Sequence, residues 1–150
     1  MQIKSKAFKN GEIIPSKYTC DSENIIPPLV FSDVPETAKS LVLIMDDPDS
    51  PTGTWTHWTV WNINPRITGI PEGMVPEGVM EGKTAFGDIG YGGPCPSKGR
   101  HRYFFKPYAL STELKLPPGS PKEELIEAMK GRVVREAETF GFYEKSRPYK

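Results

Sequence analysis

Two histidines are the only ones in this chain of 150 residues, and imidazole is the side chain whose charge changes most readily near neutral pH. His57 begins the segment "HWTVWNI" and His101 begins "HRYFFKPYAL", so each stands where a loop enters a predicted strand. If those strands are neighbours in one sheet, both rings reach the same rim. Because scaffolded loops tend to carry function, this convergence favours a binding or reactive site over two unrelated surface histidines.

The stretch "DDPDSPTGTWTHW", 46–58, places acids, prolines and tryptophans before the first histidine. A carboxylate repels phosphate, so we expect Asp47 to accept a hydrogen bond from one histidine, fix its tautomer and favour imidazolium. The outer edge of that ring and the second histidine then donate to an anion such as phosphate, sulfate or a carboxylate. Since the reference pKa of histidine is ~6.5, anion binding is predicted to be tighter near pH ~6 than near pH ~8.

The loop "GDIGYGGPCPSKG", 87–99, precedes the second histidine. Its glycines allow close approach to a ligand and offer N–H groups to an anion, while its prolines stiffen the wall. Strand alternation turns Asp49 and Arg102 away from the pocket face, where we expect a structural ion pair between them. For Asp46 the sequence leaves open whether it faces solvent or bonds to loop N–H groups.

Sixteen prolines and fourteen glycines exclude long helices over most of the chain and favour short strands. Strands are predicted over 39–45, 57–63 and 101–110, the first of them buried on both faces. Pro107 lacks a ladder donor, which predicts a bulge or an edge position there. Alternation in the second strand places Trp58 on the face opposite Trp55 and Trp61, with Trp55 nearest the pocket.

One helix is predicted from Ser120 to near Gly141 in "SPKEELIEAMKGRVVREAETFG". Ser120 is expected as N-cap and Glu123 as its capping-box partner. These elements predict one mostly-β domain over residues 1–150 with helical trimming. The tail from Phe142 to Lys150 has three open roles: covering the pocket mouth, packing in a homodimer, or remaining disordered.

Composition narrows the functional classes. Nineteen basic and nineteen acidic residues give zero formal charge, so no long-range field attracts nucleic acid or an anionic membrane. No apolar run resembles a signal peptide or a membrane span, which predicts a cytoplasmic protein without integral membrane contact. In a reducing compartment Cys20 and Cys95 are expected as free thiols.

The motifs "DPDSPTGTWTHW" and "GYGGPCPSKGRHRYFF" resemble the paired signature of the phosphatidylethanolamine-binding protein family, which includes the Raf kinase inhibitor proteins. The fragments "IPSKYTCDSENIIPPLVFSDVP" and "KSLVLIMDDPD" are similar in order and spacing, so the resemblance covers most of the chain up to about Leu110. It implies a large antiparallel sheet packed on a smaller one, a C-terminal helix, and an anion pocket at one end.

The resemblance also implies a non-catalytic binding protein without a cofactor. Its ligand would be a small anion or phosphoryl headgroup, and its partners would include a protein kinase or a serine protease. The Ser50–Pro51 bond is implied to be cis. The implied pocket residues are Asp47, Pro51, Trp55, His57, Tyr91, Gly93, Pro94, His101 and Tyr103.

Two enzymatic alternatives stay open. Asp47, His57 and His101 match the two-histidine, one-carboxylate ligand set of a metal-dependent enzyme. Cys95 lies beside the glycine loop and could act as the nucleophile of a hydrolase with a histidine as base. The prolines on either side of Cys95 favour instead a small buried residue that lines a turn.

Overall fold

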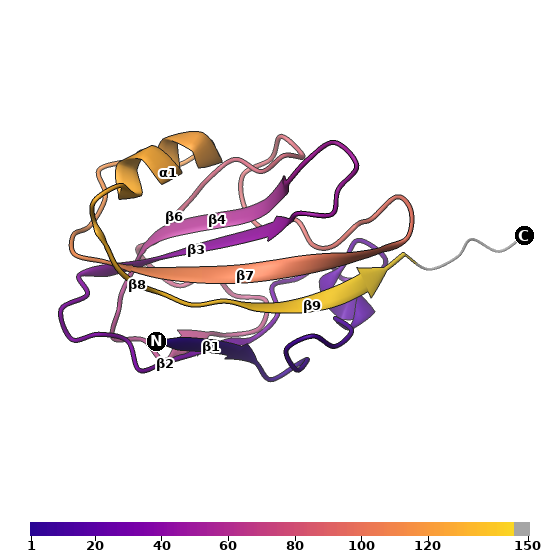
Figure 1. Cartoon of the computed structure of the whole chain (residues 1–150), viewed down its shortest axis with the longest axis horizontal. Helices are drawn as coiled ribbons and strands as arrows, with labels where there is room; N and C mark the ends of the chain where they lie inside the picture. The colour runs from indigo at the N-terminus through magenta and orange to yellow at the C-terminus, as the bar shows by residue number, and fades with distance from the viewer. Residues whose placement is uncertain (146–150) are drawn as a thin grey trace, which may run out of the picture.

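Two antiparallel sheets packed face to face form the molecule, and the computed structural model describes residues 1–145 (Figure 1). The larger sheet has six strands in the order β6-β4-β3-β7-β8, with β9 also paired to β7. The smaller sheet has the order β1-β2-β5. The predicted mostly-β fold with a large and a small sheet is confirmed. The smaller sheet contains β1 (Gln2–Ser5), β2 (Leu29–Ser32) and β5 (Gly69–Ile70); the larger contains β3 (Ser40–Asp47), β4 (Trp55–Ile63), β6 (Met80–Glu81), β7 (Arg100–Leu110), β8 (Val133–Glu136) and β9 (Thr139–Glu144); the helices are η1 (Ser16–Tyr18) and α1 (Lys122–Met129).

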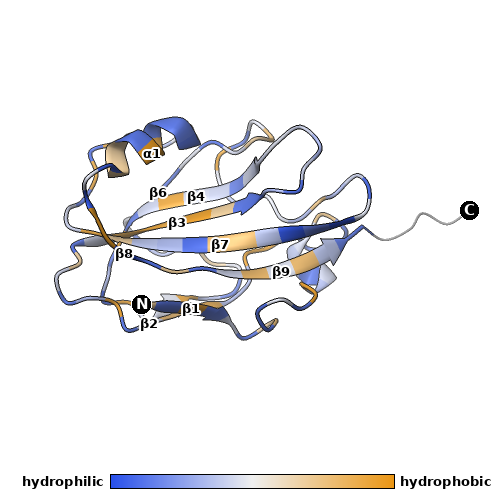
Figure 2. Ribbon diagram, in the orientation of Figure 1, coloured by the Kyte–Doolittle hydropathy of each residue, from blue (hydrophilic) through white to orange (hydrophobic). Residues whose placement is uncertain are grey.

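Strand β3 lies at the centre of the larger sheet and is buried along its whole length, as predicted. Leu43 and Met45 face the smaller sheet and join the main core, whereas Val42 and Ile44 face α1. Hydrophobic colour accordingly runs along β3 and the middle of β7 in Figure 2. A strand covered on both faces needs a continuous apolar run, which explains the unbroken segment in the sequence.

The tryptophans of β4 follow the predicted alternation only in part. Trp58 and Trp61 lie on opposite faces, but the register shift between Met45 and Asp46 puts Trp55, which pairs with Asp47, on the same face as Trp58, so that part of the prediction is wrong. Trp58 packs in the core between the sheets and Trp61 packs on the opposite face, under α1. Both side chains are fully buried, so their role is packing. Trp55, at the first position of β4, stays partly exposed at the end of the sheet.

Pro107 lies neither at an edge nor in a bulge of the β3–β7 ladder, so that prediction is wrong. It pairs with Leu43 in regular register inside the central strand β7. On the other side of β7, the partner changes at this point from β8 to β9, and Ala137 N–H donates to the Pro107 carbonyl at 3.1 Å. The missing N–H therefore falls at a gap between two partner strands, where no ladder bond is lost.

The C-terminal helix is shorter than predicted. Helix α1 ends at Met129, and Gly131 takes a φ of 76°, a left-handed conformation that ends helices. The capping box is also wrong, because the Ser120 hydroxyl donates to the Pro117 carbonyl and Pro121 occupies the N-cap position. Residues 133–144 form β8 and β9 instead, which satisfies the backbone groups along the outer side of β7.

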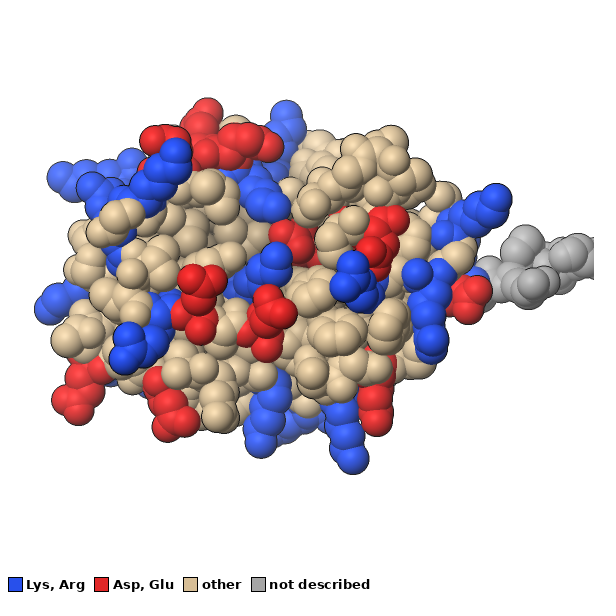
Figure 3. Space-filling model, in the orientation of Figure 1, with Lys and Arg blue, Asp and Glu red and all other residues tan. Residues whose placement is uncertain are grey.

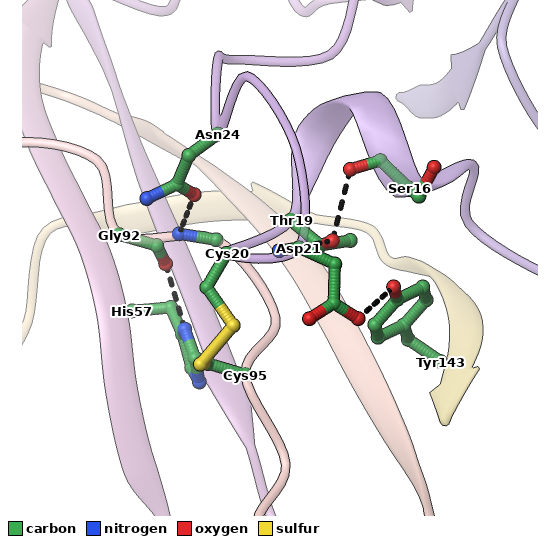
Figure 4. Close-up of a disulfide and its surroundings, with 10 residues drawn as sticks. Ser16, Thr19, Cys20, Asp21, Asn24, His57, Gly92, Cys95 and Tyr143 are labelled. Carbon is green, nitrogen blue, oxygen red and sulfur yellow. Dashed lines mark hydrogen bonds between the residues drawn. A yellow bond between two sulfur atoms is a disulfide. The ribbon is translucent and has the colours of Figure 1, made fainter. Parts of the chain in front are cut away.

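Cys20 and Cys95 form a disulfide, so the expectation of free thiols is wrong (Figure 4). The fold brings the turn after η1 against the loop before β7, where Cys20 N–H donates to the Pro94 carbonyl at 3.1 Å. The sequence shows both cysteines but cannot show that these two loops are neighbours.

Surface features agree with the composition. Acidic and basic side chains are interspersed over the face seen in Figure 3, without a single-sign field. Within residues 1–145, no helix has the length and apolar character needed to cross a membrane.

The predicted roles of the tail concern residues up to Lys150; Phe142 and Tyr143 belong to β9, and positions 146–150 lie outside the described residues.

Candidate functional site

A hollow of about 280 Å³ opens at one end of the larger sheet. At that end β3 finishes and β4 and β7 begin, on the right in Figure 1. Strand ends and two loops supply its lining, so residues far apart in sequence meet there. We call it the first hollow. Its lining comprises Asp47, Ser50, Pro51, Thr52, Trp55, His57, Phe86, Cys95, Pro96, Ser97 and His101.

Asp47 and His101 form a buried pair across the β3–β7 ladder. Asp47 Oδ2 lies 2.6 Å from His101 Nδ1, and the two residues are 3% and 7% exposed. The other carboxylate oxygen accepts the Asp49 N–H at 2.7 Å. The expected hydrogen bond between this acid and one histidine is therefore present.

The outer ring nitrogen of His101 is already used inside the protein. Nε2 lies 3.0 Å from the Lys98 carbonyl oxygen. Because both ring nitrogens face oxygen acceptors, only the doubly protonated ring donates to both. The expectation that this edge donates to a ligand is wrong for this conformation.

His57 differs from His101 in its contacts. Its Nδ1 donates to the Gly92 carbonyl at 2.7 Å, which leaves Nε2 without a hydrogen bond among residues 1–145. Burial lowers the pKa of His57 from its ordinary 6.5, and the Gly92 hydrogen bond and the charge of Asp47 oppose that effect only in part. The ring is therefore a neutral acceptor near neutral pH and becomes a donor on acidification.

Tyr103 lies beneath the two histidines and is fully buried, not part of the lining. Its ring meets His57 edge-on at 5.2 Å and stacks against His101 at 6.4 Å between centroids. Burial raises the pKa of its hydroxyl, and the nearby charge of Asp47 adds to the effect. The resemblance placed Tyr103 as a pocket wall, whereas the structure places it as the support that spaces both imidazoles.

Phe86 is the one aromatic lining residue that the sequence analysis missed, along with Ser50, Thr52, Pro96 and Ser97. Its ring is 44% exposed and meets Trp55 at 5.6 Å and His57 at 5.2 Å, both edge-on. The Ala85 N–H bond to the Thr56 carbonyl at 2.9 Å fixes this loop beside β4. A large apolar residue inside a loop rich in glycine and polar residues was the available signal.

Pro51 lines the hollow as expected, but in a trans peptide. No cis bond occurs in the described residues. Gly53 N–H donates to the Ser50 carbonyl at 3.1 Å, which closes a turn with Pro51 at its second position. A trans proline suits that position, so the implied cis bond is wrong.

Tyr91, Gly93 and Pro94 do not line the first hollow. Tyr91 and Gly93 line a separate hollow, and Pro94 is buried outside both. Gly93 is needed for close packing, because a Cβ there would lie 2.1 Å from the Tyr18 carbonyl oxygen.

The glycine N–H groups are not offered to a ligand. The N–H of Gly92 donates to the His57 carbonyl at 2.9 Å and that of Gly93 to Asn24 Oδ1 at 2.9 Å. The expectation of backbone anion donors at these two positions is wrong. The loop instead uses them to position His57 and the turn after η1.

The predicted ion pair between Asp49 and Arg102 is confirmed. Arg102 Nε and one terminal nitrogen donate to the two carboxylate oxygens at 2.9 and 2.8 Å, and the Arg102 N–H adds a bond at 2.9 Å. These bonds lower the pKa of Asp49 to about 2. Asp46, on the other face, accepts from Lys122 at 3.0 Å and so ties α1 to β3.

The two enzymatic alternatives require a set of metal ligands and a free Cys95 thiol, respectively. Within residues 1–145, no three His, Cys, Asp or Glu side chains are grouped so that they could hold a metal ion. Cys95 is oxidised in the disulfide and has no thiol to act as a nucleophile. The Cys95 hydrolase is therefore contradicted for this state of the chain.

Comparison with known proteins agrees with this architecture. The family model described as "Phosphatidylethanolamine-binding protein" matches residues 4–144. The chain belongs to the phosphatidylethanolamine-binding protein family. The resemblance inferred from the sequence motifs is thereby confirmed.

Relatives of this family member span nearly its whole length. A UPF0098 protein of Methanothermobacter thermautotrophicus is 51% identical over 150 residues, covering 97% of this chain and 99% of the relative. A crystal structure of a phosphatidylethanolamine-binding protein homologue from Chlamydia trachomatis has a TM-score of 0.93 at 46% identity and 97% coverage of each chain. YbcL of Escherichia coli, described as a member of the mammalian family, has a TM-score of 0.90 at 32% identity, covering 97% of this chain and 98% of YbcL.

Proposed function

We propose that the first hollow binds a small anion, such as phosphate, a phosphoryl headgroup or a carboxylate, without catalysing a reaction. The observation that carries the proposal is the meeting of His57 and His101 at one hollow, with Asp47 bonded to one of them. Membership of a family of generally non-catalytic binding proteins supports a ligand-binding role.

The charges around the hollow say how an anion would be held. Among residues 1–145 no lysine or arginine lines it, and one Asp47 carboxylate oxygen is taken up by its contact with His101. Protonation of His57 then adds one positive charge and one donor to the hollow. Hydroxyls of Ser50, Thr52 and Ser97 supply further donors whose charge does not vary with pH.

A protein partner can present the same chemistry. A phosphorylated or carboxylate-bearing side chain of a kinase or serine protease would place its anionic group in the hollow while its backbone contacts the rim. The half-exposed ring of Phe86 at that rim supports this extension. A cytoplasmic location, expected from the absence of a signal-peptide-like run, also belongs to the proposal; the Cys20–Cys95 disulfide opposes it, because disulfides are rare in reducing compartments.

Titration calorimetry with sodium sulfate tests the binding proposal, because the charge of sulfate stays constant between pH ~5 and ~8. Affinity should rise by about threefold or more as the solution is acidified from pH ~6.5 towards the lowered pKa of His57, since the ring gains a proton there. Phosphate and methylphosphonate extend the series to phosphoryl groups.

A pair of variants separates the hollow from the rest of the surface. His57→Gln keeps an N–H for the Gly92 carbonyl but cannot ionise, so the rise in sulfate affinity on acidification should disappear. Lys115→Gln removes one positive charge outside the lining and should leave the rise intact. Equal affinity in wild type and His57→Gln at every pH would contradict the proposal.

A further inference from the structure

A groove of about 320 Å³ lies on the smaller sheet and shares no lining residue with the first hollow. Figure 1 shows this sheet along the lower side of the molecule, whereas α1 lies along the upper side. We call it the sheet-edge groove. Its lining includes Lys6, Pro28, Val30, Gly69 and Pro71.

Strand β5 is the last strand on one side of this sheet, and Gly69 leaves backbone groups open there. The Phe31 N–H donates to the Thr68 carbonyl at 2.8 Å, so these two residues form a hydrogen-bonded pair that continues the β2–β5 register. Such pairs alternate with non-hydrogen-bonded pairs, and Val30 with Gly69 is the next pair along. The N–H and C=O of Gly69 therefore point away from β2, and neither has a partner among residues 1–145.

The open edge is limited to one residue. A Cβ at position 69 would clash with the Leu29 carbonyl oxygen, so β5 can approach β2 only with glycine there. Pro71 has no N–H, and its carbonyl already accepts the Met74 N–H at 3.3 Å. An edge this short resists pairing with whole sheets, yet it offers one donor and one acceptor to an extended peptide.

Val30 marks the outer face of the smaller sheet. Its neighbours Leu29 and Phe31 are buried in the core, so alternation turns Val30 outward. Gly69 pairs with Val30 and has no side chain, which leaves bare backbone beside the valine. A peptide residue opposite Gly69 would project its side chain onto this same face, so a small apolar side chain would pack on Val30.

A second row of side chains follows on the same face. Extending the register of both strand pairs by one residue places Lys6 and Pro71 on either side of Pro28, and all three line the groove. Within the described part of the chain, Lys6 is exposed without an ion-pair partner, and no acid lines the groove. Apolar walls beside an unpaired ammonium group suit a carboxylate on an aliphatic stem, which is the side chain of glutamate.

We propose that the sheet-edge groove binds an extended segment of a partner protein with the pattern Glu-x-Val, paired antiparallel to β5. The valine exchanges two backbone hydrogen bonds with Gly69 and packs on Val30. The glutamate, two positions earlier in the partner, lies across the prolines with its carboxylate at Lys6. Antiparallel pairing is the choice because both strand pairs of this sheet are antiparallel. This surface is independent of the anion-binding function proposed above.

Backbone amide chemical shifts measured with the peptide acetyl-Thr-Glu-Thr-Val-Thr-amide test the proposal. Shifts of residues 67–70 should move and saturate, with that of Gly69 moving most. Lys6→Gln should weaken this binding by about threefold or more, whereas acetyl-Thr-Gln-Thr-Val-Thr-amide should bind wild type and Lys6→Gln equally. Lys39→Gln, which removes an exposed lysine outside the groove, should bind the glutamate peptide as wild type does.

Methylation of the valine nitrogen in the peptide tests the backbone pairing, because it removes the N–H that donates to the Gly69 carbonyl. Saturable binding should then be lost. Absence of saturable shifts with the unmethylated peptide, or equal binding of the methylated one, would overturn the groove as a peptide site. Equal binding of the glutamate peptide by Lys6→Gln would overturn the charge partner. Saturable shifts confined to the first hollow would place the peptide there and contradict the proposal.

Discussion

The carboxylate of Asp47 and the imidazole of His101 lie 2.6 Å apart in a nearly closed space, although 54 residues separate them in the chain. Their contact crosses from β3 to β7, next to the first hollow. The pair therefore holds the ends of β3 and β7 together, and both of its residues line the first hollow.

Breaking this pair should cost far more stability than breaking the exposed one nearby. Asp47→Asn removes the charge partner of a buried ring, for which a loss of roughly 3–5 kcal/mol is expected. Asp49→Asn opens a half-exposed pair with Arg102 and should cost at most about 1 kcal/mol. Urea denaturation of both variants measures the difference, and equal losses would show that the Asp47 contact is not a stabilising buried pair.

The pH dependence of stability should carry a contribution from His57. Its folded pKa is below the unfolded value of about 6.5, so the unfolded chain binds more protons as the pH falls below that value. The contribution is thus present above pH ~6.5 and declines on acidification towards the folded pKa. Unfolding free energies of wild type and His57→Gln, compared between pH ~7.5 and ~5, should show a smaller acid loss in the variant. A larger loss in the variant would mean that the folded pKa is raised.

Asp49 should contribute to the pH dependence of stability at lower pH than His57. Its charged form is the stabilising one, whereas for His57 it is the neutral form. The folded pKa of Asp49 is about 2 against an ordinary 3.8, so its stabilising contribution is present above pH 3.8 and is lost as the pH falls through 2. Carboxylate NMR titration of Asp49 checks the pKa directly. In Arg102→Gln the pKa should return towards 3.8; an unmoved pKa would exclude the guanidinium as its cause.

Reduction of the disulfide should destabilise the chain and loosen the first hollow. Cys20 and Cys95 are 75 residues apart, and closing a loop of that order contributes about 2–4 kcal/mol. Cys95 and its neighbour Pro96 line the hollow, so sulfate affinity should fall in the double variant Cys20→Ser, Cys95→Ser. Thermal denaturation and calorimetry, with dithiothreitol-treated wild type as a second reduced form, measure both effects. If neither the double variant nor the reduced wild type were less stable, the disulfide would have no stabilising role.

Removing the Phe86 ring should change His57 more than it changes stability. The ring is half-exposed, so Phe86→Ala should cost only about 1 kcal/mol or less. Solvent then reaches His57, and its pKa should rise towards 6.5 because burial is the main cause of its lowering. Imidazole proton shifts across a pH series report this value, with Ile89→Ala as the control for an exposed apolar residue of the same loop. A pKa that stays put in Phe86→Ala would mean that the ring does not shield His57.

Much of the site could be predicted because it depends on local patterns. Histidines at strand starts, an acid at the end of an apolar run, and the alternation that turns Asp49 and Arg102 away from the pocket are all visible in one chain. They predicted correctly that His57 and His101 meet at one hollow, that Asp47 pairs with a histidine, and that Asp49 pairs with Arg102.

What failed depends on which segments become neighbours. The helix predicted to Gly141 stops at Met129 because the outer side of β7 takes residues 133–144 as strands, and tertiary pairing there outweighs local helical periodicity. The free thiols became a disulfide, and the glycine N–H groups were used by Asn24 and His57, because the turn after η1 packs against the loop before β7.

The sequence by itself determined a β-rich chain with two histidines, an acid and stiff loops at strand ends, since hydrophobic period and turn residues act over a few positions. Only the tertiary structure decided which polar groups bond inside the protein and which remain open to a ligand. Hydrogen bonds between distant segments use up donors such as His101 Nε2 and the Gly93 N–H, and those pairings arise from packing of the two sheets and their loops.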